Sequence, residues 1–284
     1  MLTLFTVPKP FEGHIDVIQR NALESWSRLP GVEILLCGDE DGVAAAATEF
    51  GASHLPDIAR NEFGTPLVGS AFREARRCAT NELLCFANAD IIFLPDLLAA
   101  ARFVSQRFGL FLLVGQRWNL DLRRRLDLDR AGWDGKLRAE VTRSGRKELP
   151  WGSDYFLFPA SVEFGEFPPF AVGRPRWDNW LIYRARRLGI PTVDASAQVT
   201  AVHQLHDHAH IPEHKAHVPR HLDETWEGPE ARASRAIARG TMGPDFVIHL
   251  HDATHLLTRW GLLPAYTPRR LLRRWRVRRV LPLR

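Results

Sequence analysis

The sequence predicts an α/β fold: a Rossmann-type sandwich with a mostly parallel central sheet and helices on both faces. Apolar runs alternate along the chain with segments whose apolar residues recur at helical spacing. The runs are continuously apolar, as in strands that are buried on both sides. The 284 residues, 45% hydrophobic and 25% charged, suffice for one large domain or two closely packed halves.

The elements expected in the first half follow from these runs and their boundaries. Pro8 ends the first apolar run, Gly38 stops the second, and Gly51 closes an alanine-rich helix. In chain order we expect a strand at 2–7, a helix at 16–29, a strand at 32–37, a helix at 42–50, a loop at 61–65, a helix at 67–80, a strand at 82–87, a helix at 97–108 and a strand at 110–114.

The second half is more polar. Residues 119–149 are rich in Arg and Asp and predict a surface excursion with one helix. Gly189 closes the next helix. The remaining expectations are a strand at 155–158, a helix at 180–188, strands within 191–202, a histidine-rich loop at 203–227, and helices at 229–239 and 254–260.

Charge and hydropathy exclude several classes of protein. The net charge is +5, but residues 268–284 hold eight arginines and no acid, so the rest of the chain is slightly negative. We therefore expect no nucleic-acid partner. The sequence contains no stretch of about 18 apolar residues, so we expect no membrane-spanning helix. The N-terminus lacks the features of a signal peptide. With three cysteines and no metal-type spacing between them, a cytoplasmic protein is expected.

Three loops are expected at one edge of the sheet, where ligands of open α/β sheets bind. They follow the first, second and third apolar runs and contain Thr6 to Pro8, Gly38-Asp39 and Asn88-Ala89-Asp90. No G-x-G-x-x-G follows the first strand and no G-x-x-x-x-G-K-[ST] is present. These absences disfavour a dinucleotide fold and exclude a P-loop NTPase.

Asp90 is the most informative residue of these loops. A carboxylate between the apolar runs 83–87 and 91–93 is costly unless it binds something. Hard divalent cations take oxygen ligands and are shared with phosphate groups, so Asp90 is a candidate to hold a metal against a diphosphate. The alternative is an aspartate that caps the next turn or helix.

Together these motifs resemble a GT-A-fold, family-2-like glycosyltransferase that uses nucleotide-diphosphate sugars. Asn88-Ala89-Asp90 resembles the D-x-D element, with Asn in place of the first Asp. The segment from Arg60 to Pro66 resembles the loop that covers the nucleotide. The resemblance spans residues 1–210. It implies a divalent metal, Mn²⁺ or Mg²⁺, at Asp90. It also implies a donor nucleotide site formed by Thr6, Pro8, Asp39, Arg60, Asn61, Gly64 and Asn88.

Two further acids are candidates for catalysis. Asp178 opens a predicted helix and resembles the family's general base, which deprotonates the acceptor hydroxyl; the alternative is a helix N-cap. Asp154 either binds sugar hydroxyls, or is itself the base, or is a turn residue. Trp151, Trp177 and Trp180 flank these acids and are candidate acceptor-binding residues, at least one of which we expect in the core.

Seven histidines lie between His203 and His221. The resemblance implies that His203 or His206, after a predicted strand, completes the metal shell or contacts the diphosphate. We expect the other histidines to be solvated, because a structural zinc site usually brings cysteine or a firm spacing.

The resemblance therefore implies a metal-assisted glycosyltransferase. Residues 1–115 would bind the nucleotide-diphosphate sugar donor and residues 116–265 the glycan or lipid-linked acceptor, packed as one domain. One alternative is a sugar nucleotidyltransferase, disfavoured because residues 8–13 hold one Lys and one Gly. Another is a non-catalytic scaffold of the same fold that binds carbohydrate or a membrane.

The tail at 266–284 carries its own expectation. Residues 269–281 mix arginine with bulky apolar residues, a pattern typical of segments that lie on anionic membrane surfaces. Peripheral contact with the inner face of the membrane is therefore one interpretation, and a solvated tail is the other.

Overall fold

The computed structural model describes residues 2–150, 152–206, 228–243 and 250–265. The first half alternates strands and helices as the sequence predicts. Its elements are β1 (Leu2–Thr6), α1 (Gly13–Ser27), β2 (Val32–Cys37), α2 (Val43–Phe50), β3 (Ser53–Leu55), α3 (Val68–Cys78), β4 (Leu83–Ala87), β5 (Ile91–Phe93), α4 (Asp96–Ser105) and β6 (Leu112–Leu120).

The second half adds strands beyond β6 and places one strand between β4 and β6. Its elements are α5 (Trp133–Ser144), β7 (Arg146–Lys147), β8 (Ser153–Pro159), α6 (Trp177–Arg187), β9 (Thr192–Asp194), β10 (Ala201–Gln204), α8 (Pro229–Met242), the short 3₁₀ helix η2 (Leu250–Asp252), β11 (His255–Thr258) and β12 (Gly261–Pro264).

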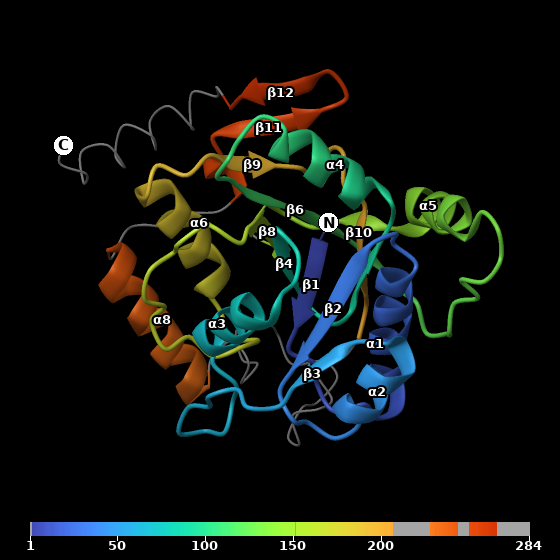
Figure 1. The fold of residues 1–284 in the computed structure, drawn as a ribbon, viewed down its shortest axis with the longest axis horizontal. Helices are drawn as coiled ribbons and strands as arrows, with labels where there is room; N and C mark the ends of the chain where they lie inside the picture. The colour runs from blue at the N-terminus through green and yellow to red at the C-terminus, as the bar shows by residue number, and fades with distance from the viewer. Residues whose placement is uncertain (1, 151, 207–227, 244–249, 266–284) are drawn as a thin grey trace.

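One sheet organises the molecule, and its main path runs β12-β11-β9-β6-β8-β4-β1-β2-β3 (Figure 1). Neighbours on this path are parallel except where β8 joins β4 and β6 and where β12 joins β11. Beside the path, β10 pairs with β5 and β6. The predicted α/β fold with a mostly parallel sheet is confirmed.

Helices cover both faces of the sheet (Figure 1). Side chains alternate along the central strands, so that Leu4 of β1 belongs to one core and Phe5 to the other. The first core packs under α1, α2 and α4, and the second under α3, α6 and α8. A third, smaller core lies between α5 and the strands β5, β6 and β10. Both sides of the central strands are therefore buried, which explains their continuously apolar sequences.

The helix expected at 254–260 is wrong, because these residues form β11 and lead into β12. β11 pairs in parallel with β9, with His255 opposite Val193, and buries Leu257 in the first core. Gly261 has a φ of 115°, which allows the tight return into β12. The tertiary partner thus overrides a local apolar spacing that suits a helix.

β6 is longer than the strand expected at 110–114, and it carries the chain past the expected boundary at residue 115 within one strand. β10 likewise extends into the segment expected to be a loop from residue 203. These extensions place Arg117, Asn119 and His203 on neighbouring strands. Among the described residues, no helix has the length and hydropathy needed to cross a membrane.

Candidate functional site

The candidate site lies where β1 and β4 end. The Asn88 N–H donates to the Asp154 carbonyl at 3.0 Å, and the Ile91 N–H donates to the Asn88 carbonyl at 3.1 Å. These bonds close a turn between β4 and β5, with Asp90 inside it. The backbone therefore holds the Asp90 carboxylate at the end of a buried strand.

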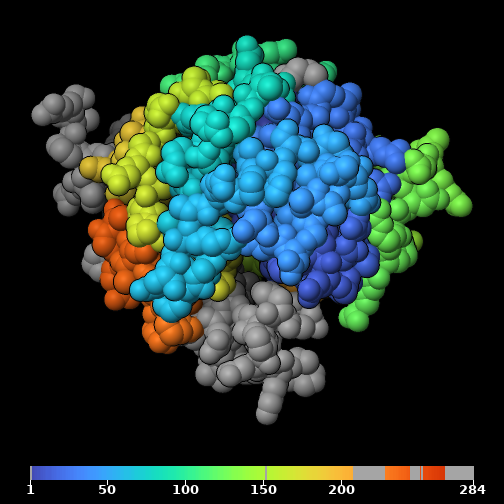
Figure 2. Space-filling model, turned by 60° about the horizontal axis from the view of Figure 1, so that its bottom comes forward, coloured from blue at the N-terminus to red at the C-terminus, as the bar shows by residue number. Residues whose placement is uncertain are grey.

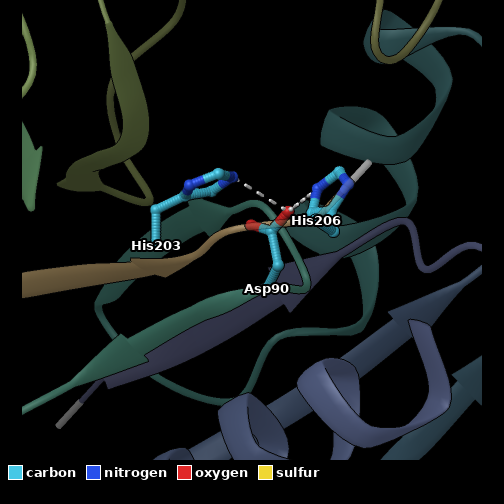
Figure 3. A group of neighbouring side chains, drawn as sticks. All are labelled: Asp90, His203 and His206. Atoms are coloured by element: carbon cyan, nitrogen blue, oxygen red, sulfur yellow. Dashed lines mark hydrogen bonds and ion pairs between the residues drawn. The ribbon is translucent and has the colours of Figure 1, made fainter. Parts of the chain in front are cut away.

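Two histidines approach Asp90 from β10 and the residues that follow it (Figure 3). His206 Nε2 lies 3.1 Å from Asp90 Oδ2, and His203 Nε2 lies 3.6 Å from the same oxygen. One ligand-type atom from each of the three residues lies within 4.8 Å of the others. The structure thus brings together the three residues that the sequence analysis assigns to a metal.

This donor set fits a divalent cation. Asp90 Oδ1 is buried and has no hydrogen-bond partner within the described part of the chain. An unpaired buried carboxylate oxygen is costly, and a cation would satisfy it. Carboxylate oxygens suit Mg²⁺ and Mn²⁺, while two imidazole nitrogens favour a transition metal such as Mn²⁺.

The surroundings also set the charges of the three residues. Burial alone would raise the pKa of Asp90, but His203, His206 and Lys9 outweigh it and hold that pKa well below its ordinary value. Burial lowers the pKa of His203 to about 4, although Asp90 opposes the change. Near neutral pH, Asp90 is therefore an anion and His203 a neutral ring, the forms in which these side chains bind metals.

Asp154 is the centre of a buried polar network beside these residues. Its Oδ1 accepts a hydrogen bond from Asn88 Nδ2 at 2.9 Å, and its Oδ2 is paired with Arg117. Burial disfavours the charged form of Arg117, but Asp154, Asp90 and Glu148 hold the pKa of this guanidinium above its ordinary value. Both carboxylate oxygens of Asp154 therefore have partners, and the Asn88 amide nitrogen points to Asp154.

Asp178 lies in the first turn of α6, and Arg176, the residue just before this helix, has a φ of 86°. Burial raises the pKa of Asp178 to about 6, and the charge of Asp154 adds to this rise, while the Asn179 N–H and Arg176 oppose it. A carboxyl group with this pKa exchanges protons readily near neutral pH. The two acids that the sequence analysis proposes for catalysis are thus close enough to influence each other.

Three expected nucleotide-binding residues form one closed loop. Arg60 pairs with Asp39 and donates to the Gly64 carbonyl at 2.8 Å, while Asn61 Oδ1 accepts from the Thr65 N–H at 3.0 Å. Gly64 has a φ of 79°, a conformation that glycine adopts without strain. In Figure 2 this loop lies on the surface next to α8.

A row of charged residues links this loop to Asp90. Glu230, in the first turn of α8, accepts from Asn61 Nδ2 at 2.6 Å and pairs with Arg174 at 2.6 Å. Burial lowers the pKa of Lys9, Asp90 opposes this effect and Arg174 adds to it. Lys9 therefore interacts electrostatically with both Asp90 and Arg174.

Sequence analysis missed five charged or polar residues of this site: Lys9, Arg117, Asn119, Glu148 and Arg174. Arg117 and Asn119 are two positions apart in β6 and so face the same side of the strand, which is a signal of a shared polar site. Lys9 lies three residues after the end of β1. Glu148 and Arg174 lie in polar segments, where no local pattern distinguishes them from surface residues.

Trp177 and Trp180 lie in the core rather than at a surface open to an acceptor. Their exposed fractions are 6% and 4%. The Trp177 ring lies 5.1 Å from both the Phe86 and Phe156 rings, and the Trp180 ring lies 5.0 Å from Phe167. The expectation of at least one core tryptophan is confirmed, and an acceptor-binding role for these two rings is not supported, because aromatic side chains already cover them.

The remaining expected residues have varied positions. Thr6 and Pro8 are buried at the end of β1, and Thr6 Oγ1 has no hydrogen-bond partner among the described residues. Trp151, the histidines from 208 to 221 and the segment 269–281 lie outside the described residues.

No family model matches the sequence, and no curated protein matches it. Solved structures do. A crystal structure of glucosyl-3-phosphoglycerate synthase from Mycobacterium tuberculosis with Mn²⁺, UDP and glucosyl-3-phosphoglycerate shares 15% identity over 86% of this chain and 81% of its own, with a TM-score of 0.48. Another structure of that enzyme shares 17% identity over 88% of each chain, with a TM-score of 0.48.

A crystal structure of S. aureus TarS 1–349 shares 14% identity over 43% of this chain, with a TM-score of 0.33. This chain covers 37% of the length of that TarS fragment. At such identities the activities of those proteins do not transfer to this chain, so its function has to be argued from its own site.

Proposed function

We propose that the chain is a glycosyltransferase that moves a sugar from a nucleotide-diphosphate donor to the hydroxyl group of a glycan or a lipid-linked sugar. The observation that carries this proposal is a pair of acids with opposite properties at one edge of the sheet. Asp90 is an anion that faces two histidines, whereas Asp178 has a pKa raised to about 6. Expelling a diphosphate and deprotonating a hydroxyl requires both kinds of group.

The donor side would be built around Asp90, His203 and His206, which would hold Mn²⁺ or Mg²⁺. When bound, the cation supplies positive charge to the leaving diphosphate. Lys9 and Arg117 add positive charge to the same region, since both interact electrostatically with Asp90. The proposed contacts to the nucleotide are Thr6, Pro8, Asp39, Arg60, Asn61 and Gly64.

The acceptor side would depend on Asp178 as the general base. Its raised pKa makes the ionised form a competent proton acceptor near neutral pH. Asp154 is less suited to this role, because Asn88 and Arg117 already engage its two oxygens. We propose that Asp154 orients Arg117 and contacts sugar hydroxyls, while Asp178 removes the proton of the attacking hydroxyl.

Product analysis distinguishes this activity from its alternatives. The protein is incubated with a panel of sugar nucleotides, Mn²⁺ and a mixture of glycan and lipid-linked acceptors. We expect release of a nucleoside diphosphate together with a glycosylated acceptor. Release of pyrophosphate from a nucleoside triphosphate would instead support the nucleotidyltransferase. A folded protein that binds neither nucleotide nor metal would support the non-catalytic scaffold.

We also propose peripheral membrane contact through residues 269–281, at the cytoplasmic face. One structural observation and one feature of the sequence support this. Trp260, at the turn between β11 and β12, is 78% exposed, and Arg259 lies over its ring. No acidic residue follows Asp252 in the sequence. Exposed tryptophan beside arginine suits the boundary of an anionic bilayer.

A further inference from the structure

A buried polar chain lies behind His203, on the side away from Asp90. β6 and β10 are parallel neighbours, and their register places Asn119 directly opposite His203. His203 Nδ1 lies 3.0 Å from Asn119 Oδ1, and Asn119 Nδ2 donates to Glu148 Oε2 at 2.9 Å. Asn119 is 7% exposed and His203 is 9% exposed, so water does not replace these partners.

The chemistry of these groups fixes the direction of each hydrogen bond. A carboxylate only accepts, so the amide nitrogen of Asn119 must face Glu148 and its carbonyl oxygen must face His203. That oxygen also only accepts, so His203 Nδ1 must carry a proton. In a neutral ring the lone pair is then on Nε2, the atom that lies 3.6 Å from Asp90 Oδ2. A lone pair and a carboxylate oxygen therefore face each other, an arrangement that a cation would stabilise.

We propose that Asn119 and Glu148 are positioning residues that hold His203 in the tautomer that presents Nε2 to a divalent cation. This inference rests on the metal site of the proposed function. Outer partners of this kind fix the ring orientation of a ligating histidine and raise its basicity. They act through His203, and neither needs to touch the metal or the substrate.

Glu148 extends the effect beyond the metal. Its Oε2 lies 3.4 Å from Arg117, and Arg117 is paired with Asp154. The same carboxylate therefore anchors His203 on one side and the Arg117–Asp154 pair on the other. A change at Glu148 should alter both the orientation of His203 and the Arg117–Asp154 pair. A change at Asn119 should alter only the orientation of His203.

Mn²⁺ binding to the full-length chain, measured from the EPR signal of free Mn²⁺, tests the proposal. Asn119→Leu keeps the side-chain size but removes both hydrogen bonds, so its Mn²⁺ affinity should fall about 10- to 100-fold. Asn81→Leu is the matched control, because Asn81 bonds Thr3 at the opposite end of β4. Its affinity for Mn²⁺ should match that of the unaltered protein.

A charge-conserving exchange separates positioning from structural support. In the double variant Asn119→Asp/Glu148→Gln, the new carboxylate accepts from His203 Nδ1 and the new amide donates to that carboxylate. The proton on Nδ1 is therefore kept, and Mn²⁺ affinity should return to within about threefold of the unaltered protein. Asn119→Asp alone places two carboxylates together and should not restore it.

The protonation of His203 can also be read without any metal or disruptive variant. Long-range ¹H–¹⁵N NMR of the metal-free protein, with His203 assigned by a His203→Gln variant, should show a proton on Nδ1 and none on Nε2. A proton on Nε2, or unaltered Mn²⁺ affinity in folded Asn119→Leu, would overturn the inference and leave the metal site standing. Absence of Mn²⁺ binding by the unaltered protein would overturn the metal site itself.

Discussion

Asp90 and Asp178 are the same residue type in two environments that push their pKa values in opposite directions. At Asp90, His203, His206 and Lys9 outweigh the effect of burial and keep the carboxylate ionised. At Asp178, burial dominates, and Asp154 adds a like charge. Pairs of titratable groups separated in this way commonly divide the work of acid–base reactions. We therefore assign charge binding to Asp90 and proton transfer to Asp178.

The pH dependence of turnover should report Asp178. Because its pKa is raised to about 6, the base is ionised above that pH and protonated below it, so the proposed transferase activity should rise as pH increases through about 6. Asp178→Asn should lower kcat by about 10²- to 10⁴-fold and leave donor binding nearly unchanged. Initial rates measured over a range of pH values check this.

Asp134→Asn is the matched control, since Asp134 also lies in the first turn of a helix, α5. This variant should retain both the rate and the pH profile.

The raised pKa of Asp178 also has a consequence for stability. A folded state that binds a proton more tightly than the unfolded chain loses stability as pH rises from about 4 to 6. Asp178→Asn should therefore be at least as stable as the unaltered protein at pH 7. For catalysis, full activity of Asp178→Asn would exclude Asp178 as the base.

Single residues of the site were predictable where a local signal marked them. Asp90 interrupts two apolar runs, and His203 follows another, so strand ends identified both. Glu148 and Arg174 had no such signal, because their partners at Asn119 and Glu230 lie 29 and 56 positions away. The sequence therefore revealed charged groups at the ends of strands and not the partners that orient them.

At the scale of elements, α6 shows how one helix supplies both structure and chemistry. Asp178 lies in its first turn, while Trp177 and Trp180 pack into the second core. The sequence predicted the helix from its periodicity, yet it could not separate a core tryptophan from one that stacks on a sugar. For β11 the predicted element itself was wrong, because pairing with β9 makes these residues a strand and not a helix.

A pair of tryptophan variants tests the core role of α6. Trp180→Ala leaves a cavity in a buried aromatic cluster and should lower the free energy of unfolding by about 3–5 kcal/mol. Trp260→Ala removes the same side chain from a site that is 78% exposed, so the change should stay within about 0.5 kcal/mol. Urea unfolding curves provide the measurement. A stable Trp180→Ala variant with weakened acceptor binding would instead restore the acceptor-binding role.

At the scale of the whole molecule, the site forms only when distant segments meet. Asp90 and His206 are 116 positions apart, and Asn61 contacts Glu230 across 169 positions. The sequence predicted which segments end at the same edge of the sheet, because parallel strands impose that rule. It could not predict that Glu230 of α8 would contact the loop at Asn61, since that contact depends on the final packing of the helix.

The basic end of the molecule should recognise anionic membranes. We expect the full-length protein to sediment with vesicles that contain about 30% phosphatidylglycerol and to stay in solution with pure phosphatidylcholine, with binding that weakens at high salt. Replacing Arg269, Arg270, Arg273 and Arg274 with Gln should reduce binding at least fivefold. Replacing Arg123 and Arg124, on the described surface, should not. Equal binding by both sets of variants would contradict membrane contact through this segment.

The central claim is that one site binds a nucleoside diphosphate together with a divalent metal. Thermal melting tests this claim. We would compare the unaltered protein, Asp90→Asn and the exposed control Asp121→Asn. Each would be melted with a panel of nucleoside diphosphates, with and without Mn²⁺. A ligand that binds only the folded state stabilises it by about 2.7 kcal/mol at 100 times its dissociation constant, which raises the melting temperature by several degrees. We expect such a rise with at least one nucleoside diphosphate, only when Mn²⁺ is present, in the unaltered protein and in Asp121→Asn. Asp90→Asn should show no rise. No rise with any nucleoside diphosphate, or an equal rise in Asp90→Asn, would contradict it.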